Sequence, residues 1–248
     1  MKLTGKVAIV TGAREGIGKA IALAFAKEGA DVVVASRNID ENSEVVKEIT
    51  ALGGRVLPIK ADVAKKNDVQ NMVQQTLETF GQVDILVNNA GLTKAGMLHK
   101  LTEEAWDLVM NVHLKGAFFA IQAVASNMME RKSGSIINVT SSAGIQGTIG
   151  QANYAAAKGG INALTMAAAR EFATFGITVN AISPFAETKM TETIATNEKF
   201  REKYLARVPM GRFGQPDEIA PTVVFLASND SRYMTGQIIC IDGGMIMG

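Results

Sequence analysis

The chain has 248 residues, of which 47% are hydrophobic and 20% are charged, and its formal net charge is +1. This composition predicts a globular protein with a sizeable core, and it lacks the basic excess that nucleic-acid binding requires. Only five prolines occur and no Gly/Ser-rich or charged tract interrupts the chain, so we expect a single domain over residues 1–248.

The first apolar run, VAIV at residues 7–10, is too short for a signal peptide or a membrane span. The one cysteine, Cys240, cannot form an internal disulfide, and it lies in an apolar run that is typical of core packing. His99 and His113 are the only histidines, and neither belongs to a cluster with metal-ligand spacing. We therefore expect a soluble cytoplasmic protein without a membrane segment or a metal site.

Short runs rich in Val and Ile alternate with longer helical patterns along the chain. The runs are continuously apolar, which is typical of parallel strands covered on both faces. In chain order, the predicted strands are residues 6–10, 31–36, 55–60, 84–89, 135–140, 177–182 and 237–242.

The clearest helical patterns between the strands cover residues 18–29, 68–81 and 216–228. Gly29 and Gly81 are expected to close the first two, because glycine readily adopts the left-handed conformation at a helix end. Repeated strand–helix alternation predicts an α/β fold, a Rossmann-type doubly wound parallel sheet of about seven strands with helices on both faces. Such sheets bind ligands at the carboxyl ends of their strands.

A glycine-rich turn, TGAREGIGKA, follows the first strand and leads into a helix. Gly12, Gly16 and Gly18 would let the backbone approach a pyrophosphate, and the helix N-terminus would favour its charge. The spacing differs from G-x-G-x-x-G, so a tight turn without a ligand is the alternative.

Residues after the second and third strands are candidates for the adenosine end of a dinucleotide. Ser36 and Arg37 stand where an acidic residue would select NAD, and with Arg14 they favour the 2′-phosphate of NADP. Glu15 places a carboxylate beside the same phosphate, and the alternative for Arg37 is a solvated loop residue. NAD therefore stays the alternative cofactor. Asp62 and Val63, after the third strand, are expected to contact the adenine edge.

The segment NNAG at residues 88–91 follows the fourth strand. Its small residues would let the backbone lie close to a flat ligand, and an Asn side chain there can tie neighbouring strands together. The alternative for this segment is an ordinary turn.

The strongest constellation follows the fifth strand. Tyr154 and Lys158 are four residues apart, so both project from one face of a helix, and Ser141 precedes Tyr154 by thirteen residues. A phenol acid, an ammonium that lowers the phenol pKa and a hydroxyl that orients a carbonyl suit reversible hydride transfer between a ketone and a secondary alcohol. An exposed Tyr–Lys pair on an ordinary helix is the alternative.

Taken together, TGAREGIG, NNAG, SSAG, YAAAK, VPMGRFGQPDEIA and the closing TGQIICIDGG resemble the short-chain dehydrogenase/reductase family over essentially the whole chain. Its 3-oxoacyl-carrier-protein reductase branch is the most similar. The resemblance implies that Tyr154 is the general acid/base, that Lys158 lowers its pKa and binds the nicotinamide ribose, and that Ser141 orients the substrate. It also implies a homotetramer. The cofactor contacts that it implies add Ile17, Asn89, Ala90, Gly91, Pro184, Phe185 and Thr188 to those above.

His113 occupies the position of the family's fourth catalytic residue, an asparagine at a helix irregularity whose main-chain carbonyl holds a water of the proton relay. A carbonyl does not depend on the side chain behind it. Our hypothesis is that His113 acts through its backbone, with the imidazole adding a polar contact.

Two features depart from the family pattern. After the sixth strand the chain reads SPFAETKM, so Phe185 replaces a glycine and Thr188, the carboxamide contact, comes one residue early. Phe175 stands where carrier-dependent relatives often have Arg, although Arg131 and Lys132 are candidates for docking an acidic carrier.

The leading interpretation is an NADP-dependent reductase of 3-oxoacyl thioesters, acting on acyl carrier protein, acyl-CoA or a free compound. The alternatives are a dehydrogenase of a small secondary alcohol, sugar or cyclic alcohol, using NAD or NADP, and a nucleotide-binding sensor without activity. We expect a helical substrate lid at about residues 187–212. Pocket walls are expected from Ile145, Gln146, Ile149 and Gln151.

Overall fold

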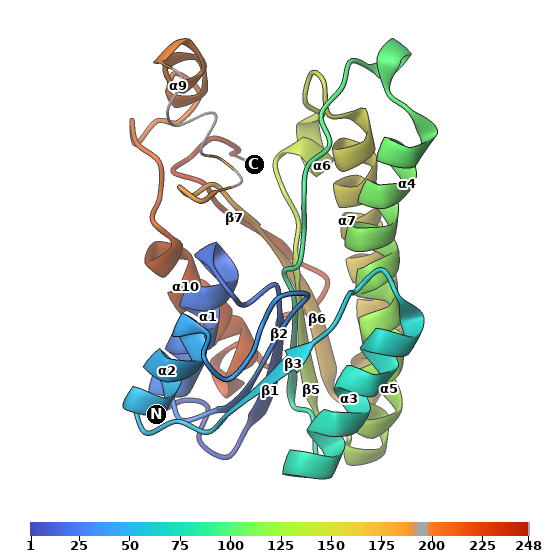
Figure 1. Ribbon diagram of the computed structural model, residues 1–248, viewed down its shortest axis with the longest axis vertical. Helices are drawn as coiled ribbons and strands as arrows, with labels where there is room; N and C mark the ends of the chain where they lie inside the picture. Colours follow the sequence, from blue (N-terminus) through green and yellow to red (C-terminus); the bar gives the residue numbers. More distant parts are fainter. Residues whose placement is uncertain (190, 192–197, 248) are drawn as a thin grey trace.

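The computed structural model describes residues 1–189, 191 and 198–247. Seven parallel strands form one sheet in the order β3-β2-β1-β4-β5-β6-β7 (Figure 1), which confirms the predicted doubly wound fold. The strands are β1 (Val7–Thr11), β2 (Asp31–Ser36), β3 (Val56–Lys60), β4 (Ile85–Asn88), β5 (Gly134–Val139), β6 (Ile177–Pro184) and β7 (Ile238–Ile241).

All seven predicted strands are present, and no strand end differs from its predicted position by more than two residues. β1, β4 and the centres of β2 and β5 are buried along their whole length, as their continuous apolar runs predict. The chain builds β1, β2 and β3 outward in one direction and then returns to place β4 on the other side of β1. The strand order therefore reverses between β1 and β4, and a crevice is expected at their carboxyl ends.

Helices cover both faces of the sheet in two layers (Figure 1). The main helices are α1 (Gly16–Lys27), α2 (Glu44–Ala51), α3 (Lys66–Phe80), α4 (Glu103–Met110), α5 (Gly116–Arg131), α6 (Ala143–Gln146), α7 (Ala152–Phe172), α9 (Glu198–Leu205) and α10 (Pro216–Ala227). Four short turns are η1 (Leu98–Lys100), η2 (Asn111–Lys115), η3 (Ala173–Phe175) and η4 (Asn229–Ser231). One apolar core lies between the sheet and α1, α2 and α10, and a second lies between the sheet and α3, α5 and α7.

Glycines close α1 and α3 as predicted. Gly81 is the C-cap residue of α3, with φ of 78°. Gly29, with φ of 86°, directly follows Glu28, the C-cap residue of α1. Both values lie in the left-handed region that a residue with a Cβ avoids.

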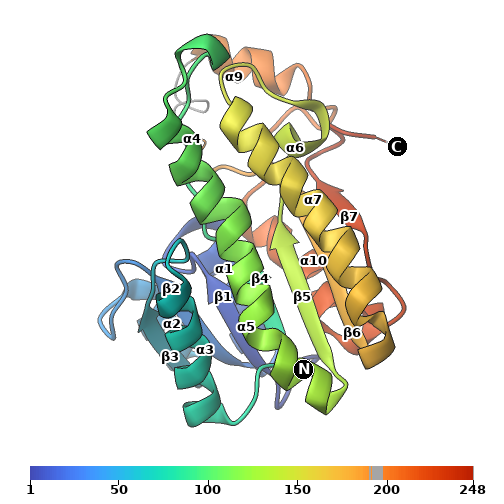
Figure 2. The ribbon, with the colours of Figure 1, turned by 90° about the vertical axis from the view of Figure 1, so that its right-hand side faces the viewer.

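Helices α4 and α5 form one continuous rod joined by the π-helical turn η2 (Figure 2). In the described part of the chain, this stretch of 29 residues is the one helix long and apolar enough to cross a membrane. Half of its most apolar window is buried within the protein. A core helix of a globular fold passes the same test, so the stretch carries no argument for a membrane.

Arg131 lies at the end of the sheet opposite the carboxyl ends of the strands. Its guanidinium donates to the Asp84 carboxylate at 2.6 Å and to the Val83 carbonyl at 3.1 Å. Asp84 is only 3% exposed, so Arg131 serves to neutralise a buried charge. Arg131 thus already has a partner, whereas Lys132 is exposed, and docking of a carrier by either residue stays a prediction.

The predicted lid at residues 187–212 lies partly outside the described residues. Its described part contains α9, above the carboxyl ends of the strands (Figure 1). Whether this segment moves as a lid stays a prediction.

Candidate active site

A cavity of about 470 Å³ opens at the carboxyl ends of the strands. Loops that follow β1 through β6 all contribute to its walls. Every residue predicted to be catalytic or to bind the cofactor lines this cavity: Gly12, Arg14, Gly16, Ile17, Gly18, Ser36, Arg37, Asp62, Val63, Asn89, Ala90, Gly91, His113, Ser141, Tyr154, Lys158, Pro184, Phe185 and Thr188. The structure thus brings these residues together, while their individual roles stay predictions.

The glycine-rich turn packs so closely that two of its positions exclude any side chain. Gly12 has φ of 66°, and a Cβ on Gly18 would lie 2.4 Å from both the Gly12 carbonyl oxygen and the Asn89 amide nitrogen. The Asn89 amide donates to the carbonyls of Thr11 at 2.9 Å and Gly12 at 3.2 Å. Asn89 therefore ties β4 to the turn, as predicted.

Helix α1 begins inside the cavity without a side-chain cap. The first turn of a helix leaves N–H groups without intrahelical acceptors, and its dipole favours an anion. Gly16, Ile17 and Gly18 present this turn to the cavity. A dinucleotide pyrophosphate fits these donors, and the missing side chains of the turn leave room for it.

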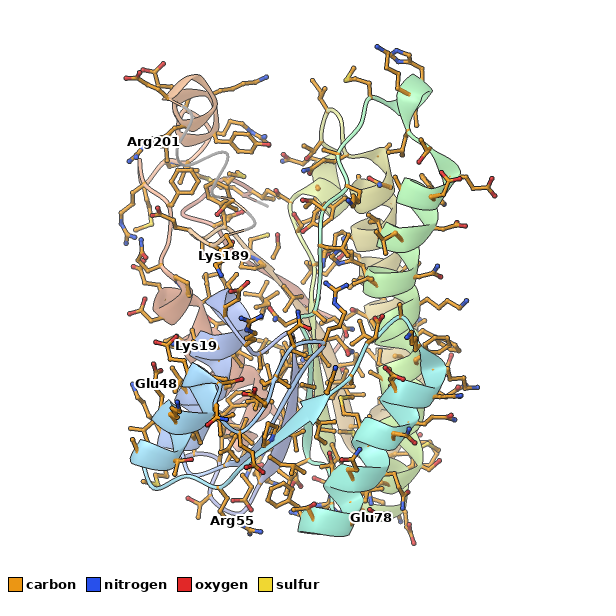
Figure 3. The ribbon with its side chains drawn as sticks, in the orientation of Figure 1. Lys19, Glu48, Arg55, Glu78, Lys189 and Arg201 are labelled. Carbon is orange, nitrogen blue, oxygen red and sulfur yellow. The ribbon has the colours of Figure 1, made fainter. Side chains whose placement is uncertain are left out.

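The adenosine end of the cavity is cationic. Arg14 and Arg37 are both exposed and both line it, beside Ser36. Glu15, the carboxylate that argues against NADP, forms an ion pair with Lys189. Figure 3 shows Lys189 beside the start of α1. The pair neutralises Glu15, so its charge opposes a 2′-phosphate less than the sequence implies.

Tyr154 and Lys158 project from the first two turns of α7. Lys158 is 3% exposed, and its ammonium donates to the Val139 carbonyl at 2.6 Å. The Lys158 nitrogen lies 5.5 Å from the centre of the Tyr154 ring. The Thr140 hydroxyl donates to the Lys158 carbonyl at 3.1 Å, which anchors the helix against β5.

Burial sets the ionisation of this pair in the free chain. It lowers the pKa of Lys158 to about 7 and raises the pKa of Tyr154, an effect that a hydrogen bond with the Ser141 hydroxyl opposes. We predicted that the ammonium would lower the phenol pKa, and the free chain differs because enclosure disfavours both charged forms. Tyr154 consequently holds its proton at neutral pH, as a general acid must.

His113 lies at the centre of the π-helical turn η2, which confirms the expected helix irregularity. Its Nε2 lies 2.7 Å from the Leu92 carbonyl oxygen and 3.1 Å from the Leu92 nitrogen. The shorter contact favours the tautomer in which Nε2–H donates to the carbonyl, and Nδ1 then has no partner among the described residues. The ring packs edge-on against Tyr154, with centroids 5.2 Å apart, and directly beneath Gly91.

The pKa of His113 falls to about 3 because the ring is buried and lies near the Lys158 charge, although the hydrogen bond with Leu92 opposes the shift. Below about pH 6.5 the unfolded chain therefore binds a proton at His113 that the folded chain does not bind. The free energy of unfolding consequently falls as the pH falls from about 6.5 towards 3. This excludes His113 as a cationic acid at neutral pH.

We expect His113→Asn to retain substantial activity, because the substitution leaves the backbone carbonyl in place. Wild type should lose about 2 kcal/mol of unfolding free energy between pH 8 and pH 5 through this one group. Because the variant lacks this group, its unfolding free energy should fall by about 2 kcal/mol less than that of wild type between pH 8 and pH 5. Urea titrations at the two pH values measure the difference. A collapse in turnover would contradict the backbone hypothesis, and an equal loss of stability would contradict the assigned pKa.

The predicted substrate walls are only partly correct. Gln151 lines the cavity, whereas Ile145 and Ile149 are 44% and 82% exposed and lie outside it. Gln146 also lies outside, where its side chain accepts a hydrogen bond from Arg207 at 3.1 Å. Sequence reasoning did not place Thr93 or Thr148 in the wall, and no local motif marks them.

Phe185 lines the cavity, and its ring stacks on that of Phe213, with centroids 4.9 Å apart. Thr188 lies near Gly16. A turn holds it there, in which the Thr188 N–H donates to the Thr191 hydroxyl at 2.8 Å. Thr188 thus reaches the cavity despite its early position.

Among the described residues, no group of three or more His, Cys, Asp or Glu side chains is arranged to hold a metal ion. The donors that converge in the cavity are instead backbone N–H groups, hydroxyls, the phenols of Tyr154 and Tyr204, the ammonium groups of Lys158 and Lys189, and the guanidinium groups of Arg14 and Arg37. These groups suit an anionic, hydroxyl-rich dinucleotide and a carbonyl oxygen.

Comparisons with known proteins agree with this geometry. The family model described as enoyl-(acyl carrier protein) reductase matches residues 12–246. The 3-oxoacyl-[acyl-carrier-protein] reductases FabG of Thermotoga maritima and Staphylococcus aureus are each 46% identical to the chain, over the full length of both proteins. A short-chain type dehydrogenase/reductase from Mycobacterium marinum has the same fold, with a TM-score of 0.94 and 35% identity over 100% of this chain and 98% of its own.

Proposed function

Because the chain belongs to the short-chain dehydrogenase/reductase family, we propose that it reduces 3-oxoacyl thioesters to 3-hydroxyacyl thioesters with NADPH. It is an oxidoreductase that acts on CH–OH groups and uses a nicotinamide cofactor. The 3-oxoacyl-carrier-protein reductases that share 46% of its residues support the thioester substrate.

One observation carries the proposal. Ser141, Tyr154 and Lys158 meet in the same cavity as the uncapped start of α1. A nucleotide sensor would need the anion site alone, and it would have no reason to bury a lysine beside a phenol. The combination favours an enzyme over a binding protein.

The chain's own residues supply each proton and each orienting contact. The Ser141 hydroxyl donates a hydrogen bond to the ketone oxygen and holds it beside the Tyr154 phenol. Tyr154, protonated at neutral pH, donates its proton to that oxygen as negative charge develops there. Lys158 lies 5.5 Å from the ring centre and stabilises the phenolate that remains. When bound, the nicotinamide cofactor supplies the hydride.

We propose NADPH rather than NADH as the cofactor. Arg14 and Arg37 are the cations that line the adenosine end, and Lys189 compensates Glu15. Two guanidinium groups suit a 2′-phosphate, which they can bind through paired hydrogen bonds.

Arg37→Ala is expected to raise KM for NADPH about tenfold and to leave KM for NADH nearly unchanged, since only NADPH carries the 2′-phosphate. Steady-state kinetics with each cofactor tests this. Lys27→Ala is the matched control, because Lys27 is an exposed cation at the far end of α1. Equal losses for both cofactors would contradict a contact with the 2′-phosphate.

The activity itself is tested by NADPH consumption with acetoacetyl-CoA, with NADH in parallel. Crotonoyl-CoA, which has a carbon–carbon double bond in place of the ketone, is the comparison substrate for an enoyl reductase. We expect turnover of the ketone and little of the alkene. Binding of NADPH without turnover of any thioester would favour the alternative, a dehydrogenase of small alcohols.

We further propose a homotetramer. Phe118, Trp106 and Met166 are exposed apolar side chains on α5, α4 and α7, and burial between subunits would remove them from water. Light scattering after size-exclusion chromatography tests this. Docking of an acyl carrier protein and a cytoplasmic location stay predictions.

A further inference from the structure

Phe185 is the middle ring of a three-ring stack. Its centroid lies 4.9 Å from that of Phe213, with 27° between the rings, and 6.2 Å from that of Tyr204, with 9° between the rings. Phe213 is only 5% exposed, so it is fixed in the protein interior. The stack joins the end of β6, helix α9 and the segment before α10, and offset stacking of this kind restrains each ring.

Two of the three rings face the cavity. Phe185 and Tyr204 line it, whereas Phe213 lies behind Phe185 and does not. The wall that carries Ser141 is polar, because Thr148 and Gln151 also contribute to it. When the ketone of a substrate lies at Ser141, its apolar acyl chain can therefore pack on the side of the cavity that carries Phe185 and Tyr204.

The rival apolar surface is not available. Ile145 and Ile149 project into solvent outside the cavity. In addition, the hydrogen bond between Arg207 and Gln146 connects the chain just after α9 to the end of α6.

We propose that Phe185 and Tyr204 form the acyl-chain wall and restrict the enzyme to short 3-oxoacyl groups. This inference rests on the proposed function. A longer chain has to displace Phe185, and Phe213 blocks that movement from behind. Close-packed interiors resist such shifts, and methylenes that find no apolar contact add nothing to transition-state binding.

The test is kcat/KM for 3-oxoacyl-CoA substrates from four to twelve carbons. Wild type should prefer the four-carbon substrate over the twelve-carbon one by about tenfold or more, the effect expected of a pocket that cannot accept added methylenes. Phe185→Gly should reduce that preference by about tenfold. Phe185→Leu, which keeps most of the bulk, is the matched control and should keep the wild-type preference.

Tyr204 provides an independent variant, because it lies on α9 and its loss leaves the core intact. Tyr204→Ala should weaken the chain-length preference and raise KM, whereas Tyr204→Phe retains the ring and should behave as wild type. An unchanged preference in both Phe185→Gly and Tyr204→Ala would overturn the inference.

If wild type turns over no thioester at all, the proposed function is wrong, but the acyl-chain wall can still be tested. Calorimetry of butyryl-CoA and dodecanoyl-CoA binding to the enzyme–NADP complex then compares the affinities for a short and a long chain. Tighter binding of butyryl-CoA by wild type, lost in Phe185→Gly, would support the inference. The same relative affinity for the two ligands in both proteins would overturn it.

Discussion

Replacing Tyr154 with Phe should lower kcat for ketone reduction by about 10³-fold, because it removes the phenol whose hydroxyl is hydrogen-bonded to Ser141 and serves as the proton donor. The phenyl ring retains the edge-on packing against His113, which lies 5.2 Å away between centroids, so the fold should persist. The variant should still bind NADPH, since the helix start and the arginines are unchanged.

Rapid-quench or stopped-flow measurement of the reduction step, together with NADPH titration by fluorescence, separates these effects. Loss of both turnover and cofactor binding would indicate a damaged site rather than a missing acid. Retention of more than about a tenth of wild-type kcat would show that another group supplies the proton.

Replacing Lys158 with Met should lower kcat by about 10²-fold and, at the same time, stabilise the free protein at neutral pH. The loss of activity follows because no ammonium remains to stabilise the Tyr154 phenolate. The gain in stability follows because wild type buries an ionisable group whose pKa falls to about 7 in the folded chain.

The sign of the pH effect follows from proton binding. Between about pH 7 and the ordinary lysine pKa of 10.5, the unfolded chain binds the proton that the folded chain has released. The unfolding free energy of wild type should therefore rise by up to about 1.4 kcal/mol per pH unit over this range. Urea titrations of wild type and Lys158→Met at pH 7 and pH 9 should show the rise in wild type only, and parallel curves would contradict the buried assignment.

The four-residue interval between Tyr154 and Lys158 predicted their position but not their ionisation. Tyr154 and Lys158 were predicted to share a helix face, and α7 begins just before them, so the four-residue interval places both in the cavity. The opposite pKa shifts of the two groups were not predicted. They depend on how completely β5, His113 and the loop around Ser141 enclose the pair, and no interval along the chain encodes that enclosure.

The substrate side was the least predictable part of the site. Ile145, Gln146 and Ile149 follow the fifth strand, as wall residues would, yet none of the three lines the cavity. The apolar wall instead comes from Phe185 and Tyr204. Their meeting depends on packing between segments that have no common sequence pattern.

Local patterns in the sequence were enough to predict the succession of strands and helices, the glycine-rich turn and the Tyr154–Lys158 pair. Each depends on the conformations of a few neighbouring residues, whose preferences are expressed locally. By contrast, long-range packing produces the ion pair of Glu15 with Lys189, 174 residues apart, the contact of His113 with Leu92 and the stack on Phe185. These features require distant segments to pack, and packing sets which charges are compensated, which groups lose water and which side chains face the substrate.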